Sequence, residues 1–246
     1  MDFQDHFSRQ SDIYLKARPT YPDDLFRFLA SVSPTTSLCW DCATGNGQAA
    51  VSLAKHFDKV IATDASSKQL GNAIQLKNIE YRLAAAENSG LNNFSADLIT
   101  VATAAHWFKH DLFFAEVKRV IKPGGILALW TYGEALISEE IDALMNWFMY
   151  DYLYDYWPDA RWYVRDKYTT LPFPFHTLDT PNFTCRAVWK KEQWLNYVCS
   201  WSAYNSYVLK NGTDPLNKLL QPLSLLWNDV EEKAVEWPLH LKCARL

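Results

Sequence analysis

The stretch Leu38-Cys-Trp-Asp41-Cys-Ala-Thr-Gly45-Asn-Gly47 contains the pattern that decides the fold. Ser37–Cys42 is a short apolar run typical of a buried strand, and a turn with two glycines follows it. The next segment, Gln48–Phe57, repeats apolar residues at helical spacing. A glycine turn between a strand and a helix lets a ligand approach the backbone at the helix N-terminus, so this point is a candidate binding site.

The same alternation of short apolar runs and helical segments continues as far as Tyr132. Further strands are predicted at Val60–Thr63, Ile79–Leu83, Leu98–Ala102 and Ile126–Trp130. Helices are predicted at Ser67–Leu76 and from a cap at Asp111 to Ile121, with a turn at Pro123-Gly124-Gly125. This pattern predicts an α/β fold, a Rossmann-like three-layer sandwich that binds ligands outside the carboxyl ends of its parallel strands.

Beyond Tyr132 the alternation stops and aromatic residues become frequent. We expect a helix at Ile137–Tyr156, irregular chain at Pro158–Pro181, strands at Phe183–Trp189 and Val235–Ala244, and helices at Glu192–Tyr204 and Pro215–Trp227. The chain is predicted to be a single domain, 1–246, with four parts. These are an N-terminal helical segment (1–36), a cofactor-binding core (37–132), an aromatic helical lid inserted after the fifth strand (133–182), and strands and helices that complete the sheet (183–246).

Two acidic residues end neighbouring predicted strands. Asp41 precedes the glycine turn, where a carboxylate would repel a pyrophosphate but suits a cationic amino group or a sulfonium. Asp64 ends the next strand, where its carboxylate can accept both hydroxyls of a ribose. Taken alone, Gly45-Asn-Gly47-Gln-Ala-Ala50 also fits the dinucleotide fingerprint, so an NAD(P)-dependent oxidoreductase is an alternative.

These residues resemble the motifs of the class I S-adenosylmethionine-dependent methyltransferases. Asp41-x-Ala-x-Gly45-x-Gly47 is similar to their first motif, and Asp64 matches their ribose-binding acid. Ala86-Glu87 falls where the family places adenine, and Arg119–Gly125 resembles the turn before the fifth strand. The resemblance implies S-adenosyl-L-methionine as cofactor and a seven-stranded sheet whose last strand is antiparallel. Ala43 is a departure, because many members carry glycine there.

Two further segments are similar to the trans-aconitate methyltransferase-like (methyltransferase type 11) group. They are Tyr14-Leu-Lys-Ala-Arg18-Pro-Thr-Tyr21-Pro and Ala104-Ala-His106-Trp107-Phe108. This resemblance implies methyl transfer to a small-molecule acceptor, with carboxylate O-methylation as the preferred reaction. A homologue that binds the cofactor without catalysis is a second alternative, in which Ala43 or the lid has spoiled the active geometry.

The candidate site residues are assigned to three roles: cofactor binding, catalysis and acceptor binding. The predicted cofactor-binding residues are Tyr14, Arg18, Asp41, Ala43, Gly45, Gly47, Asp64, Ala65, Ala86, Glu87 and Thr103. The predicted catalytic residues are His106 and Trp107, and the predicted acceptor-binding residues are Tyr21, His106, Trp107, Tyr132, Arg161 and Arg165. His106 either donates a hydrogen bond that orients a carboxylate or acts as the general base for an amine or phenol.

Composition argues against several other classes of protein. The formal net charge is −4 and no cluster of Lys and Arg is present, so nucleic acid is not an expected partner. We expect no signal peptide, because the first residues lack a basic start followed by an apolar run, and we find no apolar run long enough for a bilayer and no metal-ligand spacing among the His, Cys and Asp residues. We therefore expect a cytoplasmic, metal-free monomer or weak homodimer that does not act at a membrane.

Overall fold

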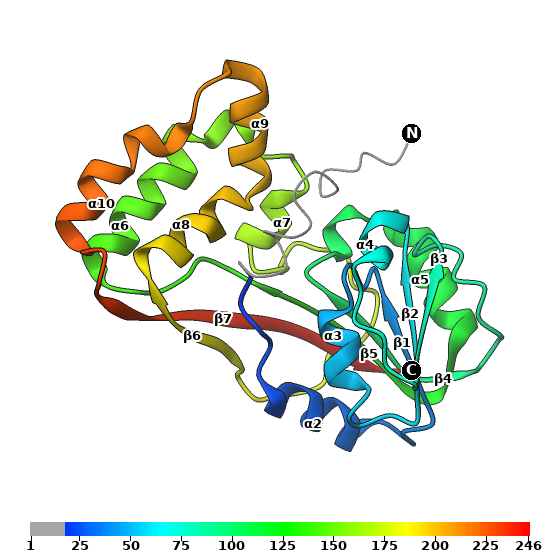
Figure 1. Ribbon diagram of the computed structural model, residues 1–246. Coiled ribbons are helices and arrows are strands. Elements are labelled where there is room, and N and C mark those ends of the chain that lie inside the picture. Colours follow the sequence, from blue (N-terminus) through cyan, green and yellow to red (C-terminus); the bar gives the residue numbers. More distant parts are fainter. Residues whose placement is uncertain (1–17) are drawn as a thin grey trace.

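The computed structural model, which describes residues 18–246, has an α/β fold built on one seven-stranded sheet (Figure 1). The strand order is β3-β2-β1-β4-β5-β7-β6. Neighbours from β3 to β5 are parallel, and β7 is antiparallel to both β5 and β6, which confirms the predicted sheet. The strands are β1 (Leu38–Cys42), β2 (Lys59–Asp64), β3 (Ile79–Leu83), β4 (Ala96–Ala102), β5 (Ile121–Tyr132), β6 (Thr184–Lys190) and β7 (Glu232–Arg245).

The helices fall into two groups. Those flanking the parallel strands are α2 (Asp23–Val32), α3 (Gln48–Leu53), α4 (Ser67–Gly71) and α5 (His110–Val120). Those after β5 are α6 (Glu139–Trp147), α7 (Arg161–Arg165), α8 (Lys191–Cys199), α9 (Ser202–Asn211) and α10 (Leu220–Leu226). Short 3₁₀ segments lie at Ala105–Trp107, Tyr154–Tyr156 and Pro215–Lys218, and a π-helical turn at Phe148–Tyr152 follows α6 directly.

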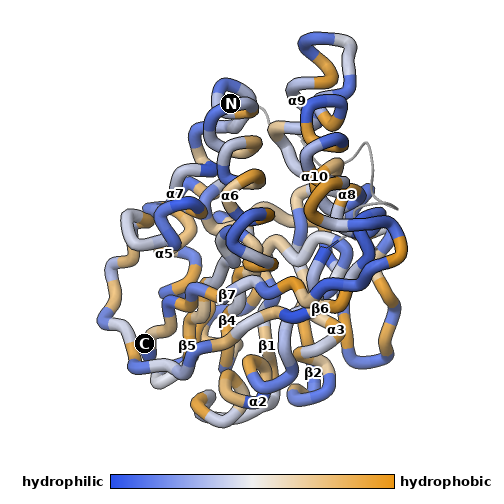
Figure 2. Tube along the Cα trace, turned by 90° about the vertical axis from the view of Figure 1, so that its left-hand side faces the viewer, coloured by the Kyte–Doolittle hydropathy of each residue, from blue (hydrophilic) through white to orange (hydrophobic). Residues whose placement is uncertain are grey.

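Alternate residues of the central strands face two different hydrophobic cores. Cys39 and Val60 pack with α2 and α3 on one face of the sheet, whereas Trp40 and Ile61 pack with α5 on the other. Both faces are covered, so the strands are buried almost throughout, as expected of parallel strands in a three-layer sandwich. Figure 2 shows hydrophobic segments along the strands of the sheet.

The structure corrects two predictions about the segment before β5. Asp111 does not cap α5: the helix begins after Lys109, whose backbone N–H donates to a carboxylate oxygen of Glu87 at 2.9 Å. Pro123-Gly124-Gly125, predicted as a turn before the fifth strand, lies inside that strand, because β5 already begins at Ile121. These residues form a bulge inside β5, where the pairing with β4 changes register, and Gly124 adopts a φ of +78°.

Several predicted helices are shorter or divided. The segments predicted at Gln48–Phe57 and Ser67–Leu76 end at Leu53 and Gly71. The helix predicted at Glu192–Tyr204 is divided into α8 and α9, because Trp201 takes an extended backbone and buries its indole. The helix predicted at Pro215–Trp227 is a 3₁₀ turn followed by α10, and the irregular segment Pro158–Pro181 contains the short helix α7.

Helices α6 to α10 gather beyond the carboxyl end of β5 (Figure 1). The lid predicted at 133–182 supplies α6 and α7, and the chain between β6 and β7 adds α8, α9 and α10. The five helices α6 to α10 together form the lid, in which α10 packs against α6 and α8 packs against α9. None of the helices in residues 18–246 combines the length and apolar character that a membrane-spanning helix requires.

Candidate functional site

The glycine turn after β1 is a left-handed stretch of backbone. Ala43, Gly45 and Gly47 have φ values of +54°, +59° and +85°. A Cβ added to Gly45 would meet no atom within 4 Å, so this residue presents bare backbone to open space. Ala43 takes the conformation that glycine adopts at no steric cost, which explains why glycine is common at this position of the motif. The turn therefore has the shape of a cradle for a ligand.

Asp41 lies under this turn at the end of β1. Its carboxylate is fully buried and accepts hydrogen bonds from the Thr44 hydroxyl at 2.5 Å and the Thr100 hydroxyl at 2.7 Å. Burial raises the pKa of Asp41 to about 6, although both hydroxyl bonds oppose that shift. A cationic ligand group near this carboxylate would stabilise its ionised form.

Asp64 holds the other side of the turn. One carboxylate oxygen accepts from the backbone N–H of Gly45 and the other from that of Ser66, each at 2.8 Å. The predicted pair of acids therefore comes together, with the glycine turn between two neighbouring strand ends. Among the other cofactor candidates, Ala65 is exposed beside Asp64, and Ala86 is buried after β3 next to Glu87, which accepts from the backbone N–H of Lys109 just before α5.

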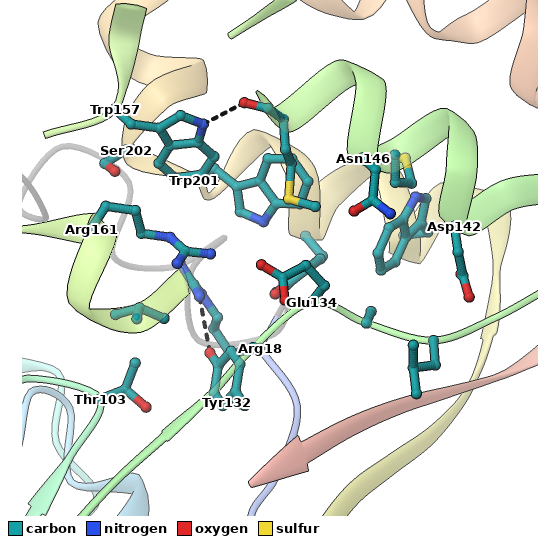
Figure 3. A pocket seen from close by; sticks show the side chains of 18 of the residues that line it. Arg18, Thr103, Tyr132, Glu134, Asp142, Asn146, Trp157, Arg161, Trp201 and Ser202 are labelled. Carbon is teal, nitrogen blue, oxygen red and sulfur yellow. Dashed lines mark hydrogen bonds between the residues drawn. The ribbon is translucent and has the colours of Figure 1, made fainter. Parts of the chain in front are cut away.

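A cavity of about 120 Å³ lies between the carboxyl ends of β4 and β5 and the lid (Figure 3). Six predicted site residues line it, namely Arg18, Thr103, His106, Trp107, Tyr132 and Arg161. Tyr21 does not line the cavity itself, but its hydroxyl lies 3.1 Å from the hydroxyl of Thr103, which does. The glycine turn and Asp64 do not belong to the lining. Tyr14 lies outside the described residues.

Arg161 and Arg165, both predicted to bind the acceptor, lie on α7 but take different positions relative to the cavity. Arg161 lines the cavity, with its guanidinium over the Trp157 ring at 5.0 Å. Within the described residues, its buried Nη1 has no hydrogen-bond partner. Arg165 does not line the cavity, because its guanidinium lies over the rings of Tyr150 and Trp162.

Arg18 connects the core to the lid. Its guanidinium donates to the Tyr132 hydroxyl at 2.9 Å and to the Ser200 carbonyl at 3.3 Å, and it lies 5.4 Å from the centre of the Tyr197 ring. Figure 3 shows Arg18 and Arg161 extending toward each other at the end of the cavity that Tyr132 and Thr103 mark. Two positive charges thus lie beside two strand ends.

His106 is a buried, neutral side chain. Burial lowers its pKa to about 3, and the nearby charge of Arg161 adds to that shift. Its Nδ1 lies 2.9 Å from the Tyr168 hydroxyl. A histidine with so low a pKa is a weak base near neutral pH, so this environment favours the orienting role over that of general base.

Sequence reasoning missed several residues around the cavity. Tyr168 is fully buried and follows Lys167 in two successive left-handed residues, a conformation that no sequence signal indicates. Met145, Met149 and Trp194 were missed as lining residues, although the frequent aromatic residues after Tyr132 pointed to this region. Within residues 18–246, no group of three or more His, Cys, Asp or Glu side chains is arranged to hold a metal ion.

Comparisons with known proteins show the family of the chain. The methyltransferase domain family matches residues 40–129 of the chain. A Dictyostelium discoideum protein assigned as a methyltransferase is 36% identical over 225 residues, which make up 90% of this chain and 86% of that protein. A Saccharomyces cerevisiae protein assigned as an S-adenosylmethionine-dependent methyltransferase is 25% identical and covers 84% of this chain and 83% of its own length.

A solved structure is similar over nearly the whole fold. It is that of an Anaeromyxobacter dehalogenans protein assigned as a type II methyltransferase, 36% identical, with a TM-score of 0.86, covering 93% of this chain and 97% of its own. These likenesses decide against the oxidoreductase alternative, while the trans-aconitate subgroup stays a prediction. The chain is an enzyme of the class I S-adenosylmethionine-dependent methyltransferases.

Proposed function

We propose that the enzyme transfers a methyl group to the carboxylate of a small molecule held in the cavity between the strand ends and the lid. The observation that carries this proposal is the buried Nη1 of Arg161, which faces the cavity region without a hydrogen-bond partner among the described residues. A guanidinium binds a carboxylate through two parallel hydrogen bonds, so such an acceptor would satisfy this group.

The residues of the glycine turn fit the expected cofactor. We assign the open space beside Gly45, together with Asp41, to the amino-acid part of the cofactor. Asp64 is assigned to the ribose and the buried Ala86 to the adenine. S-adenosyl-L-methionine supplies a methyl group that its sulfonium already activates. The chain's own task is then to align the acceptor and exclude water, and alignment alone can lower a barrier by about 7–11 kcal/mol.

The state of His106 supports an acceptor that needs no base. An amine or phenol must lose a proton, and a histidine with a pKa of about 3 is poorly suited to take it. A carboxylate is already ionised at neutral pH. Its oxygen forms a bond to the methyl carbon while the carbon–sulfur bond breaks and the electron pair stays on sulfur. The products are a neutral methyl ester and S-adenosylhomocysteine, and no proton moves.

Three acceptors with the same body test the proposal: phenylbutanoic acid, phenylbutylamine and phenylbutanol, each with radiolabelled S-adenosylmethionine. We expect the label to enter the acid and to be released as methanol by mild alkali. Arg161→Met should lower kcat/KM for the acid about tenfold to a hundredfold, because charge-assisted hydrogen bonds are lost. Arg165→Met, on the same helix but off the cavity lining, is the control. Methylation of the amine or alcohol in preference to the acid would refute the proposal.

A further inference from the structure

We propose that the acceptor is a monocarboxylic acid with an extended apolar body, and that acids with a second, distal carboxylate are rejected. This inference rests on the proposed carboxylate methylation and adds which acids fit. It follows from the order of side chains along the cavity, with positive charge at the strand ends, an apolar middle, and the acidic side chain of Asp142 beyond.

Positive charge is confined to one end. Of the described residues that line the cavity, only Arg18 and Arg161 carry a permanent positive charge. Figure 3 places both beside Tyr132 and Thr103, at the ends of β5 and β4. Arg18 is already bonded to Tyr132 and Ser200, so Arg161 is the group best placed to receive a carboxylate. A single available guanidinium can bind a single carboxylate of the acceptor.

The middle of the cavity is apolar. Met145, Met149, Trp194 and Trp201 line it, and each is at most 5% exposed. Trp157 donates its indole N–H to the carbonyl of Met149 at 2.8 Å, so its polar atom is engaged and its ring is left for apolar contact. Methionine and tryptophan are large, adaptable or planar apolar surfaces. A hydrocarbon or aromatic body would bury well against them.

One acidic side chain of the lining, Asp142, lies away from the arginines, whereas Glu134 lies close to Arg18 (Figure 3). Glu134 and Asp142 both line the cavity, and Figure 3 shows Asp142 with Asn146 at the end opposite Thr103. Glu134 accepts a hydrogen bond from the Tyr150 hydroxyl, and Asp142 accepts one from the backbone N–H of Ile137 at 2.8 Å. A second carboxylate of an extended acid would approach Asp142, where no described cation of the lining offsets the repulsion.

Matched pairs of acids test this order. Each pair has one backbone length and differs only in a terminal carboxylate: hexanoate and adipate, octanoate and suberate, decanoate and sebacate. For the monocarboxylates, kcat/KM should rise about two- to fourfold with each added methylene until the cavity is filled. Each dicarboxylate should be methylated at least about tenfold more slowly than its partner, because a carboxylate loses hydration without gaining a cation.

The outcomes separate this inference from the proposed function. If dicarboxylates or tricarballylate are methylated as well as the monocarboxylates, the enzyme methylates acids but the apolar-body inference is wrong. If kcat/KM does not change with chain length, the apolar middle does not bind the acceptor and the inference is again wrong. If phenylbutylamine or phenylbutanol is methylated and no acid is, the proposed function itself fails.

A single substitution should reverse the preference. Asn146 is exposed at the far end of the cavity and lies four residues after Asp142 on α6. Asn146→Lys adds a cation there, so methylation of suberate should rise at least about fivefold relative to octanoate. Ala143→Lys is the matched control, because Ala143 is exposed on the same helix but does not line the cavity. An equal change in both variants, or no change in Asn146→Lys, would show that the distal carboxylate does not lie near Asn146 and would overturn the inference.

Discussion

The two sides of the proposed active site are built from contacts of very different range. On the cofactor side, the Gly45 amide is bonded to an acid 19 residues away, and the Thr44 hydroxyl to one 3 residues away. On the acceptor side, Arg18 is bonded to residues 114 and 182 positions away in the chain. The longest of the described bonds on the cofactor side joins Asp41 to Thr100, 59 residues away, and all of them lie within the core, whereas the acceptor side exists only when the lid packs on the core. The contrast implies that acceptor choice can change while the cofactor side is preserved.

The strongest test of this division removes a carboxylate from the cofactor side. Asp64→Ala leaves the Gly45 and Ser66 amides without their acceptor, and we expect a loss of about 1–3 kcal/mol in binding of S-adenosylhomocysteine. Isothermal titration measures this loss as a higher Kd. Asp58→Ala, an exposed acid just before β2, is the control. An unchanged Kd would mean that Asp64 does not contribute to cofactor binding.

A second test separates stability from function on the same side. The pKa of Asp41 is raised in the folded enzyme to about 6, so between about pH 4 and 6 the folded state binds more protons than the unfolded one. Stability therefore falls as pH rises through this window. Asp41→Asn should gain about 2 kcal/mol in the free energy of unfolding at neutral pH, and the gain should shrink toward pH 4.

Urea denaturation at several pH values measures this effect. A gain that stays the same across the pH range would mean that Asp41 is not the group responsible. The same variant should bind S-adenosylmethionine more weakly, since it lacks the negative charge next to the glycine turn. Higher stability with lower affinity would indicate that the ionised carboxylate is kept for binding.

The smallest expected effect lies on the acceptor side. Tyr168→Phe keeps the buried ring but removes the hydroxyl that contacts Nδ1 of His106, so kcat/KM for the acid should fall about three- to tenfold. Nitrogen NMR of labelled histidine should then show a changed tautomer balance, which a purely packing role would leave alone. The control is Tyr152→Phe, which removes a lid hydroxyl bonded to Tyr207. A loss of cofactor affinity in Tyr168→Phe would contradict the division into two sides.

The range of contacts also explains what the sequence could predict. The strand–turn–helix pattern and the acids at the strand ends are local, so the sheet and the meeting of Asp41 and Asp64 could be anticipated. The sequence could not distinguish Arg161 from Arg165, because the direction of each side chain depends on how α7 is oriented relative to the other helices of the lid. The cap predicted at Asp111 was wrong because α5 already begins at His110, and the backbone N–H of Lys109, just before the helix, donates to Glu87, 22 residues away.

The fit between Gly47 and Tyr81 has a consequence for the evolution of this enzyme. A Cβ on Gly47 would lie 2.3 Å from the Tyr81 hydroxyl oxygen, which also donates to the Ile74 carbonyl at 2.9 Å. Any larger residue at position 47 would therefore have to displace the tyrosine and release the chain after α4. The two positions should change together among descendants, with a smaller side chain at position 81 arising before glycine is lost at position 47.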